Sequence, residues 1–117
     1  MTDRIKRKYT KTGHTNNPEI SKMYRNWYSI KSRCKKGNYL KKGIVMCAEW
    51  NDSFVSFYDY VTKLPRYSFD KVGIGKDKYT LDRIDNNGNY EPNNVRWATT
   101  KEQWANSENA IIVKILY

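Results

Sequence analysis

Cysteine and histidine are scarce in this chain, and their scarcity excludes several kinds of site. The 117 residues include two cysteines, Cys34 and Cys47, and one histidine, His14. A structural zinc site takes four Cys or His ligands and a disulfide framework takes several cysteine pairs, so we expect neither. Any mechanism that needs two histidines is also excluded. Because so few cysteines are present, we expect the protein to work in a reducing cytosol.

Long apolar runs are also absent. Only 38% of the residues are hydrophobic, and no stretch approaches the roughly 20 consecutive apolar residues of a membrane-spanning helix. Residues 1–14 lack the apolar segment of a secretory signal. Aromatic residues are abundant, with ten Tyr, four Trp and three Phe, and such large flat side chains build a small core from few residues. We therefore expect one small folded domain that is neither disordered nor embedded in a membrane.

Acidic residues are nearly missing from the first third of the chain. Residues 1–42 hold 13 Lys or Arg but only two acids, a net charge of +11. Residues 43–117 hold nine Lys or Arg and ten acids, a net charge of −1. Positive charge gathered in this way repels itself unless a polyanion is near, which favours a nucleic-acid partner. A basic face that serves solubility is the alternative.

The chain begins with a basic arm. Residues 1–16 lack a hydrophobic period, which predicts a flexible arm followed by one domain over residues 17–117. We expect DNA phosphates to contact basic side chains of the arm, of the first helix and of a later hairpin. These side chains are Arg4, Lys6, Arg7, Lys8, Lys11, Arg25, Lys31, Arg33, Lys35, Lys36 and Arg96.

The first helix has a clear start signal. Asn17 and Pro18 predict its beginning, because Asn caps helix N-termini and Pro fits the first turn. Apolar residues then recur at spacings of three and four as far as Cys34. The helix is expected to end near Lys36, with Gly37 as its C-cap.

The middle of the chain gives weaker signals. Residues 43–47 predict a short strand, and Ser53 and its two predecessors can cap a second helix. Residues 66–78, with glycines and mixed charges, indicate a loop or loose hairpin. The apolar tail at residues 110–117 predicts a last strand or a pairing edge. The aromatic residues expected in the core include Tyr24, Tyr28, Trp50, Trp97 and Trp104.

A later segment predicts the order strand, long loop, strand, helix. Residues 79–84 and 95–98 predict two strands, joined by a loop rich in Asp, Asn and Gly. Thr99 and Glu102 have the spacing of a capping box, which opens the third helix. Together with the two earlier helices, this order predicts a small α+β domain.

These residues resemble a known family. The stretch LDRIDNNGNYEPNNVRWAT at residues 81–99 is similar to the nuclease motif of the phage-type HNH endonucleases, including those associated with homing. A similar lead-in includes Trp27, Arg33, Cys34, the run GIVMCAEW at residues 43–50, Ser53, Phe54 and Phe57. The resemblance covers about residues 17–109. It implies a ββα-metal motif over about residues 79–108, a divalent cation (Mg²⁺ or Mn²⁺) and a DNA substrate.

The resemblance further implies that the chain is a metal-dependent DNA endonuclease that hydrolyses phosphodiester bonds. Such hydrolysis places a cation beside the scissile phosphate, and magnesium prefers hard oxygen ligands. Asp82 corresponds to the family's carboxylate ligand. The second ligand, nine positions after the loop-closing Asn94, corresponds to Gln103, with Asn106 on the same helix face as the alternative. An ion pair between Asp82 and Arg83, and an exposed Gln103, are the non-catalytic interpretations.

Arg83 stands where the family commonly has a general-base histidine. Arginine stays protonated at any working pH and cannot accept a proton from water. Either the domain is a catalytically inactive DNA-binding protein, or another residue accepts the proton while Arg83 holds the scissile phosphate. The candidates for that acceptor are Tyr79, Tyr90 and His14.

Two expectations concern the loop and the size of the domain. Asp85 and Asn94 are expected to be structural, because short polar side chains in a long loop usually bond to the loop backbone. A domain this small has room for few base contacts. A sequence-specific enzyme is therefore expected to form a homodimer or to use a partner protein.

Overall fold

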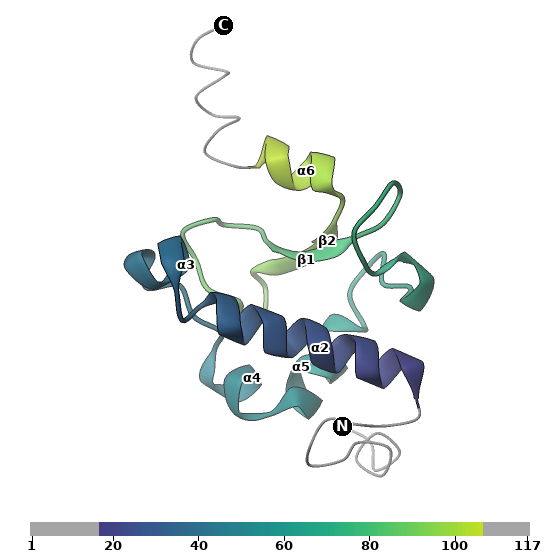
Figure 1. Ribbon diagram of the computed structural model, residues 1–117, viewed down its shortest axis with the longest axis horizontal. Helices are drawn as coiled ribbons and strands as arrows, with labels where there is room; N and C mark the ends of the chain where they lie inside the picture. The colour runs from purple at the N-terminus through teal and green to yellow at the C-terminus, as the bar shows by residue number, and fades with distance from the viewer. Residues whose placement is uncertain (1–16, 107–117) are drawn as a thin grey trace, which may run out of the picture.

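The described part of the chain mixes helices with one two-stranded antiparallel sheet. The computed structural model describes residues 17–106, so the expected arm and the expected C-terminal strand lie outside the described residues. The elements are α2 (Pro18–Arg33), α3 (Gly37–Lys42), α4 (Ala48–Asp52), α5 (Phe54–Val61), the 3₁₀ helix η1 (Phe69–Lys71), β1 (Thr80–Arg83), β2 (Val95–Ala98) and α6 (Thr100–Ala105). Figure 1 shows α2 running across the molecule, with the β1–β2 hairpin on one side and α4 and α5 on the other. The expected α+β class is confirmed.

Helix α2 begins where the sequence predicts and ends earlier. The side chain of Asn17 accepts a hydrogen bond from the N–H of Ile20 at 3.1 Å, and Pro18 lies in the first turn. The expected end near Lys36 is wrong, because the helix ends at Arg33 and the N–H groups of Lys35 and Lys36 bond to carbonyls three residues back. The buried stripe of the helix consists of Ile20, Met23, Trp27 and Ile30.

Gly37 opens α3 instead of capping α2. Helix α3 has no counterpart in the sequence-based expectation, and it begins at Gly37 with a φ of 61°. It ends at Gly43, whose φ of 72° is the left-handed conformation of a helix C-cap. The capping glycine therefore lies one helix later than the sequence predicts.

The short strand expected at residues 43–47 is not formed. Met46 makes only an isolated parallel bridge to Tyr90. The N–H and the carbonyl of Tyr90 bond to the residues on either side of Met46 at 3.0 and 2.9 Å. The pairing stops there because the chain turns into α4 at Ala48.

The second expected helix is α5, and the region that follows it is more ordered than expected. Ser53 caps α5 by accepting a hydrogen bond from the N–H of Ser56 at 3.2 Å. Residues 66–78, expected as a loop or loose hairpin, contain η1 and an isolated bridge between Val72 and Tyr79. This bridge brings the chain into position for β1.

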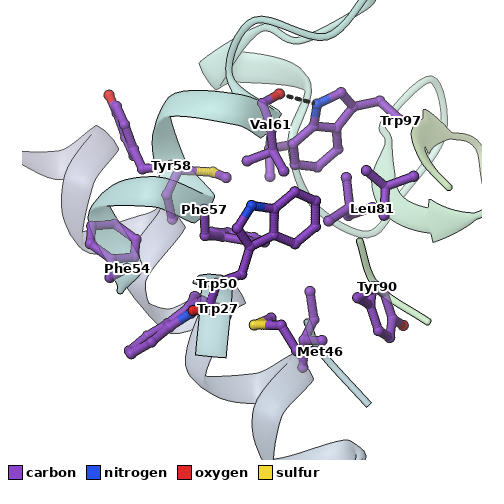
Figure 2. Packing of buried hydrophobic residues seen from close by; sticks show 14 of the residues in the cluster. Trp27, Met46, Trp50, Phe54, Phe57, Tyr58, Val61, Leu81, Tyr90 and Trp97 are labelled. Carbon is purple, nitrogen blue, oxygen red and sulfur yellow. Dashed lines mark hydrogen bonds between the residues drawn. The ribbon is translucent and has the colours of Figure 1, made fainter. Parts of the chain in front are cut away.

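An aromatic core joins α4 and α5 to the hairpin. Trp50 and Trp97 are 1% and 2% exposed. Figure 2 shows Trp50 in the middle of the buried cluster, between Phe57 and Leu81. The indole N–H of Trp97 donates to the carbonyl of Val61 at 2.8 Å (Figure 2), which connects β2 to the end of α5.

Two aromatic residues are not in the core. The expectation for Tyr28 and Trp104 is wrong, because these side chains are 63% and 53% exposed. Tyr28 follows the buried Trp27 by one residue, so it turns away from the buried stripe of α2.

Cys34 and Cys47 are free thiols. Among residues 17–106, no helix has the length and apolarity to span a membrane.

The hairpin and α6 follow the predicted order of strand, long loop, strand and helix. β1 and β2 are antiparallel, with Thr80 opposite Ala98, Leu81 opposite Trp97, Asp82 opposite Arg96 and Arg83 opposite Val95. The predicted capping box opens α6. Thr99 Oγ1 accepts from the N–H of Glu102 at 3.2 Å, and the Glu102 carboxylate accepts from the N–H of Thr99 at 2.9 Å.

Candidate active site

A cleft of about 620 Å³ lies between α2, β1 and α6. The charged side chains that line it are Lys22, Arg25 and Arg33 from α2 and Asp82 from β1. The polar side chains are Asn26 and Ser29 from α2, Tyr39 from α3, Thr80 from β1, Tyr90 from the loop between the strands, and Thr100 and Gln103 from α6. The three cations of the cleft therefore come from α2, and its carboxylate comes from β1. A second cavity of about 600 Å³, beside α4 and α5, contains none of the residues predicted for the site.

The pleat of β1 separates two neighbouring site residues. Successive side chains of a strand point to opposite faces. Leu81 and Arg83 face inward and are 5% and 7% exposed. Thr80 and Asp82 lie on the other face. Of these four strand residues, Arg83 alone does not line the cleft. Asp82 and Arg83 are adjacent in the sequence but do not form an ion pair.

Asp82 is paired across the hairpin instead. Its Oδ2 lies 3.2 Å from Nε of Arg96, and its side chain is 13% exposed. Burial raises the pKa of Asp82 above its ordinary value, although the hydrogen bond from Arg96 and the charges of Arg96 and Arg83 act in the opposite direction. The carboxylate is thus only partly compensated by its surroundings.

Of the two alternatives for a second ligand, only Gln103 shares the cleft with Asp82. Its Nε2 donates to Thr80 Oγ1 and, at 3.0 Å, to the carbonyl of Ala98. This orientation leaves the amide oxygen as the acceptor. Asn106 instead donates to the carbonyl of Ile84 at 2.9 Å, so its side chain fastens the end of α6 to the loop.

The donor set in the cleft fits a divalent cation of the magnesium type. A carboxylate and an amide oxygen are hard ligands, and Mg²⁺ commonly takes one or two protein ligands together with water and phosphate oxygens. No group of three or more His, Cys, Asp or Glu side chains in residues 17–106 could hold a metal ion. A cation between Asp82 and Gln103 would take its remaining ligands from solvent and from a bound phosphate.

Arg83 is bound within the fold. Its Nη1 donates to the carbonyls of Asn86 and, at 3.0 Å, Gly88. Its guanidinium carbon lies 4.7 Å from the ring centre of Tyr39 and 5.5 Å from that of Tyr90. A guanidinium that is buried and bonded in this way holds the loop between the strands, and it is not presented to a phosphate in the cleft.

The same loop is held from inside by Asn94. Its Oδ1 accepts from the N–H of Asp85 at 2.9 Å, and its Nδ2 donates to the carbonyl of Asn89 at 2.8 Å. Asp85 Oδ1 accepts from the N–H of Asn87 at 2.9 Å. A Cβ at Gly88 would lie 2.7 Å from Asn94 Nδ2, so the close approach requires glycine. These contacts fix the loop relative to β1.

The three candidates for a proton acceptor do not occupy equivalent places. His14 lies outside the described residues. Tyr79 packs under the guanidinium of Arg66, 5.3 Å from ring centre to guanidinium carbon, and is not among the residues that line the cleft. Tyr90 lines the cleft but is 2% exposed. The pKa of Tyr90 is raised, and burial is the largest cause.

Tyr39 is a cleft residue that the sequence analysis missed. Its hydroxyl lies 3.4 Å from the hydroxyl of Tyr90, which is itself 3.4 Å from Nη1 of Arg33. Burial acts to raise the pKa of Tyr39, but the hydrogen bonds with Tyr90, Arg83 and Arg33 and the charge of Arg83 outweigh it and lower the pKa. Because these partners are 51 residues away or belong to other elements, no local pattern could have identified Tyr39.

The predicted DNA-binding residues are divided between two sides of α2. Arg25 and Arg33 line the cleft, together with Lys22, which the sequence analysis did not single out. Lys31 lies elsewhere, with its Nζ 4.1 Å from the ring centre of Trp27 and 3.0 Å from the carbonyl of Asn51. Lys35 and Lys36, just after the end of α2, are exposed. Arg96 is paired with Asp82. The predicted cations of the arm lie outside the described residues.

Comparisons of the chain with protein-family models, with curated proteins and with solved structures found no match.

Proposed function

We propose that the protein is a divalent-metal-dependent endonuclease that hydrolyses phosphodiester bonds of DNA, with the cleft between α2 and the hairpin as its active site. One observation carries this proposal. Asp82 and Gln103, placed at ligand positions by their resemblance to the HNH nuclease motif, line the same cleft as Arg25 and Arg33. A carboxylate and an amide that share a cleft with cationic side chains suit a phosphate held next to a divalent cation.

The residues of the cleft have different roles in this proposal. Arg25, Arg33 and Lys22 attract and position the DNA backbone through charge and hydrogen bonds. Asp82 and Gln103 would hold the cation. A cation bound there would neutralise charge on the scissile phosphate and on the leaving oxygen. The loop contacts of Arg83 and Asn94 keep β1, and with it Asp82, in a fixed position.

Tyr39 takes the place of the missing histidine in this proposal. The nucleophilic water must give up a proton. A tyrosine accepts it only in its deprotonated phenolate form, which a lowered pKa makes more populated, whereas an arginine cannot accept it. Arg83 lies against the Tyr39 ring and contributes to that lowering, so it acts as a positioning residue behind Tyr39. The arginine at the histidine position and the tyrosine beside it thus form one functional pair.

Cleavage of supercoiled plasmid by the full chain tests the proposal, with Mg²⁺ and with a chelator. We expect cleavage only with Mg²⁺, and its loss in Asp82→Asn with DNA binding retained. Asp59→Asn is the matched control, because Asp59 is a half-exposed residue of α5 that forms an ion pair with Lys63 and does not line the cleft. Equal cleavage by Asp82→Asn and wild type would overturn the assignment of the site.

A second candidate function is DNA binding by a catalytically inactive domain of the same kind. It is favoured by the burial of Arg83 at the usual histidine position. In that case the wild type binds DNA with the salt dependence of a basic protein but leaves plasmid intact under all metal conditions.

A further inference from the structure

Ile74 is the most exposed large apolar side chain in the part of the chain that the structure describes. It is 90% exposed, whereas the next in rank, Tyr28, is 63% exposed. Ile74 lies between Gly73 and Gly75, whose φ values of 146° and 142° belong to a region that favours glycine. The backbone at the tip of this loop is therefore specified by the sequence Gly-Ile-Gly.

The loop stands on a well-held base. Val72 is 3% exposed in the core, and the N–H of Gly73 donates to the carbonyl of Tyr79 at 2.9 Å. The N–H of Tyr79 donates to the carbonyl of Lys71 at 2.7 Å. On the side of α2, Lys22 Nζ donates to the carbonyl of Phe69 at 2.9 Å. A rigid base with an apolar tip differs from an ordinary flexible loop.

The position and charge of the loop tip indicate what kind of partner it contacts. Ile74 lines the same cleft as Asp82 and Arg25. Lys71, Lys76 and Lys78 surround it in sequence and are exposed, with Asp77 as the one acid between residues 71 and 78. A protein partner for an apolar tip would not require this excess of positive charge, whereas a polyanion would.

We propose that Ile74 is a wedge that inserts between neighbouring base pairs of duplex DNA beside the phosphate held in the cleft. This inference rests on the proposed function. Apolar side chains that enter a base step partly unstack it and kink the duplex, while nearby cations hold the backbone. Such a kink would turn the backbone at that step toward Asp82 and Gln103.

A wedge has a consequence that phosphate contacts alone do not have. Unstacking costs least where the base pair is already mismatched, so the protein should prefer a duplex with a central mismatch over a fully paired one. Binding through phosphates alone would treat the two duplexes nearly alike.

The test uses the full chain in the presence of a chelator, so that DNA is bound but not cut. Short duplexes, paired or with one central mismatch, carry 2-aminopurine, which brightens when it unstacks, and fluorescence anisotropy reports binding. For the wild type we expect brightening and about tenfold tighter binding of the mismatched duplex, because unstacking is cheapest there. Ile74→Ala should lose both effects and keep its affinity for the paired duplex within about twofold, because its phosphate contacts remain.

Two further variants complete the test. Ile84→Ala is the matched control, since Ile84 is 49% exposed at the other end of β1 and should behave as wild type. Ile74→Leu keeps an apolar tip and should restore the brightening. If the wild type and Ile74→Ala brighten 2-aminopurine equally, or if neither does so on binding, the proposed role of Ile74 as a wedge is wrong while the proposed function stands. If the wild type binds no duplex at all, both are wrong.

Discussion

The two faces of strand β1 carry different tasks, although their residues alternate in the sequence. Thr80 and Asp82 present polar atoms to the cleft. Leu81 and Arg83 face inward, where one fills the core and the other binds the loop. Adjacent residues that the HNH resemblance treats as one catalytic pair therefore lie in different surroundings, Asp82 at the cleft and Arg83 against the loop.

The two faces also differ in how well their charges are compensated. Arg83 has carbonyl acceptors on one side and two aromatic rings on the other, so its buried charge is stabilised by the fold. Asp82 has one ion pair and a pKa that burial raises. The poorly compensated charge lies on the cleft face, as expected for a group that binds something else. Substitutions on the two faces should separate activity from stability.

The largest expected effect concerns Tyr39, which lines the cleft and packs against the inward-facing Arg83. Tyr39→Phe keeps the ring against Arg83 but removes the proton acceptor, so we expect cleavage to fall by about a hundredfold or more. In the wild type the rate should rise with pH and level off above the pKa of Tyr39, which lies below the ordinary value of about 10. The variant should lack this inflection.

Tyr28→Phe is the control for that experiment, because Tyr28 lies on α2, is 63% exposed and does not line the cleft. The near-ultraviolet absorbance of tyrosinate gives a readout that does not depend on cleavage. One tyrosine should titrate early in the wild type and in Tyr28→Phe, but not in Tyr39→Phe. Identical titrations in all three proteins would contradict the role of Tyr39.

The next largest effect is expected on the inward face. Arg83→Ala leaves the carbonyls of Asn86 and Gly88 without their donor, and we expect the free energy of unfolding to fall by about 2–4 kcal/mol. Arg83→Lys should recover only part of this loss, because an ammonium cannot reproduce the planar fork. Urea denaturation measures both values. A variant with wild-type stability and lost cleavage would instead make Arg83 a phosphate ligand.

The loop itself should show a smaller effect. Asn94→Ala removes bonds to Asp85 and Asn89 in a half-exposed setting, and we expect a loss of about 1–3 kcal/mol in urea denaturation. Gly88→Ala should have a similar cost, since the new Cβ would lie 2.7 Å from Asn94 Nδ2. If Gly88→Ala is neutral while Asn94→Ala is costly, the loop adapts to the methyl group, and the close packing is not required.

The parts of the fold that the sequence predicts are those with a local cause. The starts of α2 and α6 depend on Asn17 and Thr99, whose side chains bond within three residues of themselves. Helix α3 was not predicted because Gly37 and Gly43 are both suitable C-caps, and only packing decides between them. The same limit applies to residues 43–47, where one long-range bridge replaces a strand.

The candidate site was predictable only as far as the motif reaches. The resemblance identified Asp82 and Gln103, and the structure places both in one cleft. It gave no indication that Arg83 would turn inward, because this depends on the carbonyls of the folded loop. Tyr39 and Lys22 enter the cleft through contacts 51 and 47 residues away in the sequence. Such contacts leave no periodic or spacing signal.

The smallest expected effect comes from Arg96, on the cleft side of the hairpin. Its guanidinium pairs with Asp82 and thereby competes with a cation for the same carboxylate. Its side chain is 38% exposed, so the pair contributes at most about 1 kcal/mol, and Arg96→Gln should leave stability nearly unchanged. At neutral pH, removal of the competitor should tighten Mg²⁺ binding by about two- to fivefold, the binding equivalent of such a pair. The Mg²⁺ dependence of cleavage measures this, with paramagnetic Mn²⁺ titration as a second readout. Weaker binding in Arg96→Gln would show that the guanidinium orients Asp82 for the cation instead of competing with it, and the cleft face would then be pre-organised in the same way as the inward face.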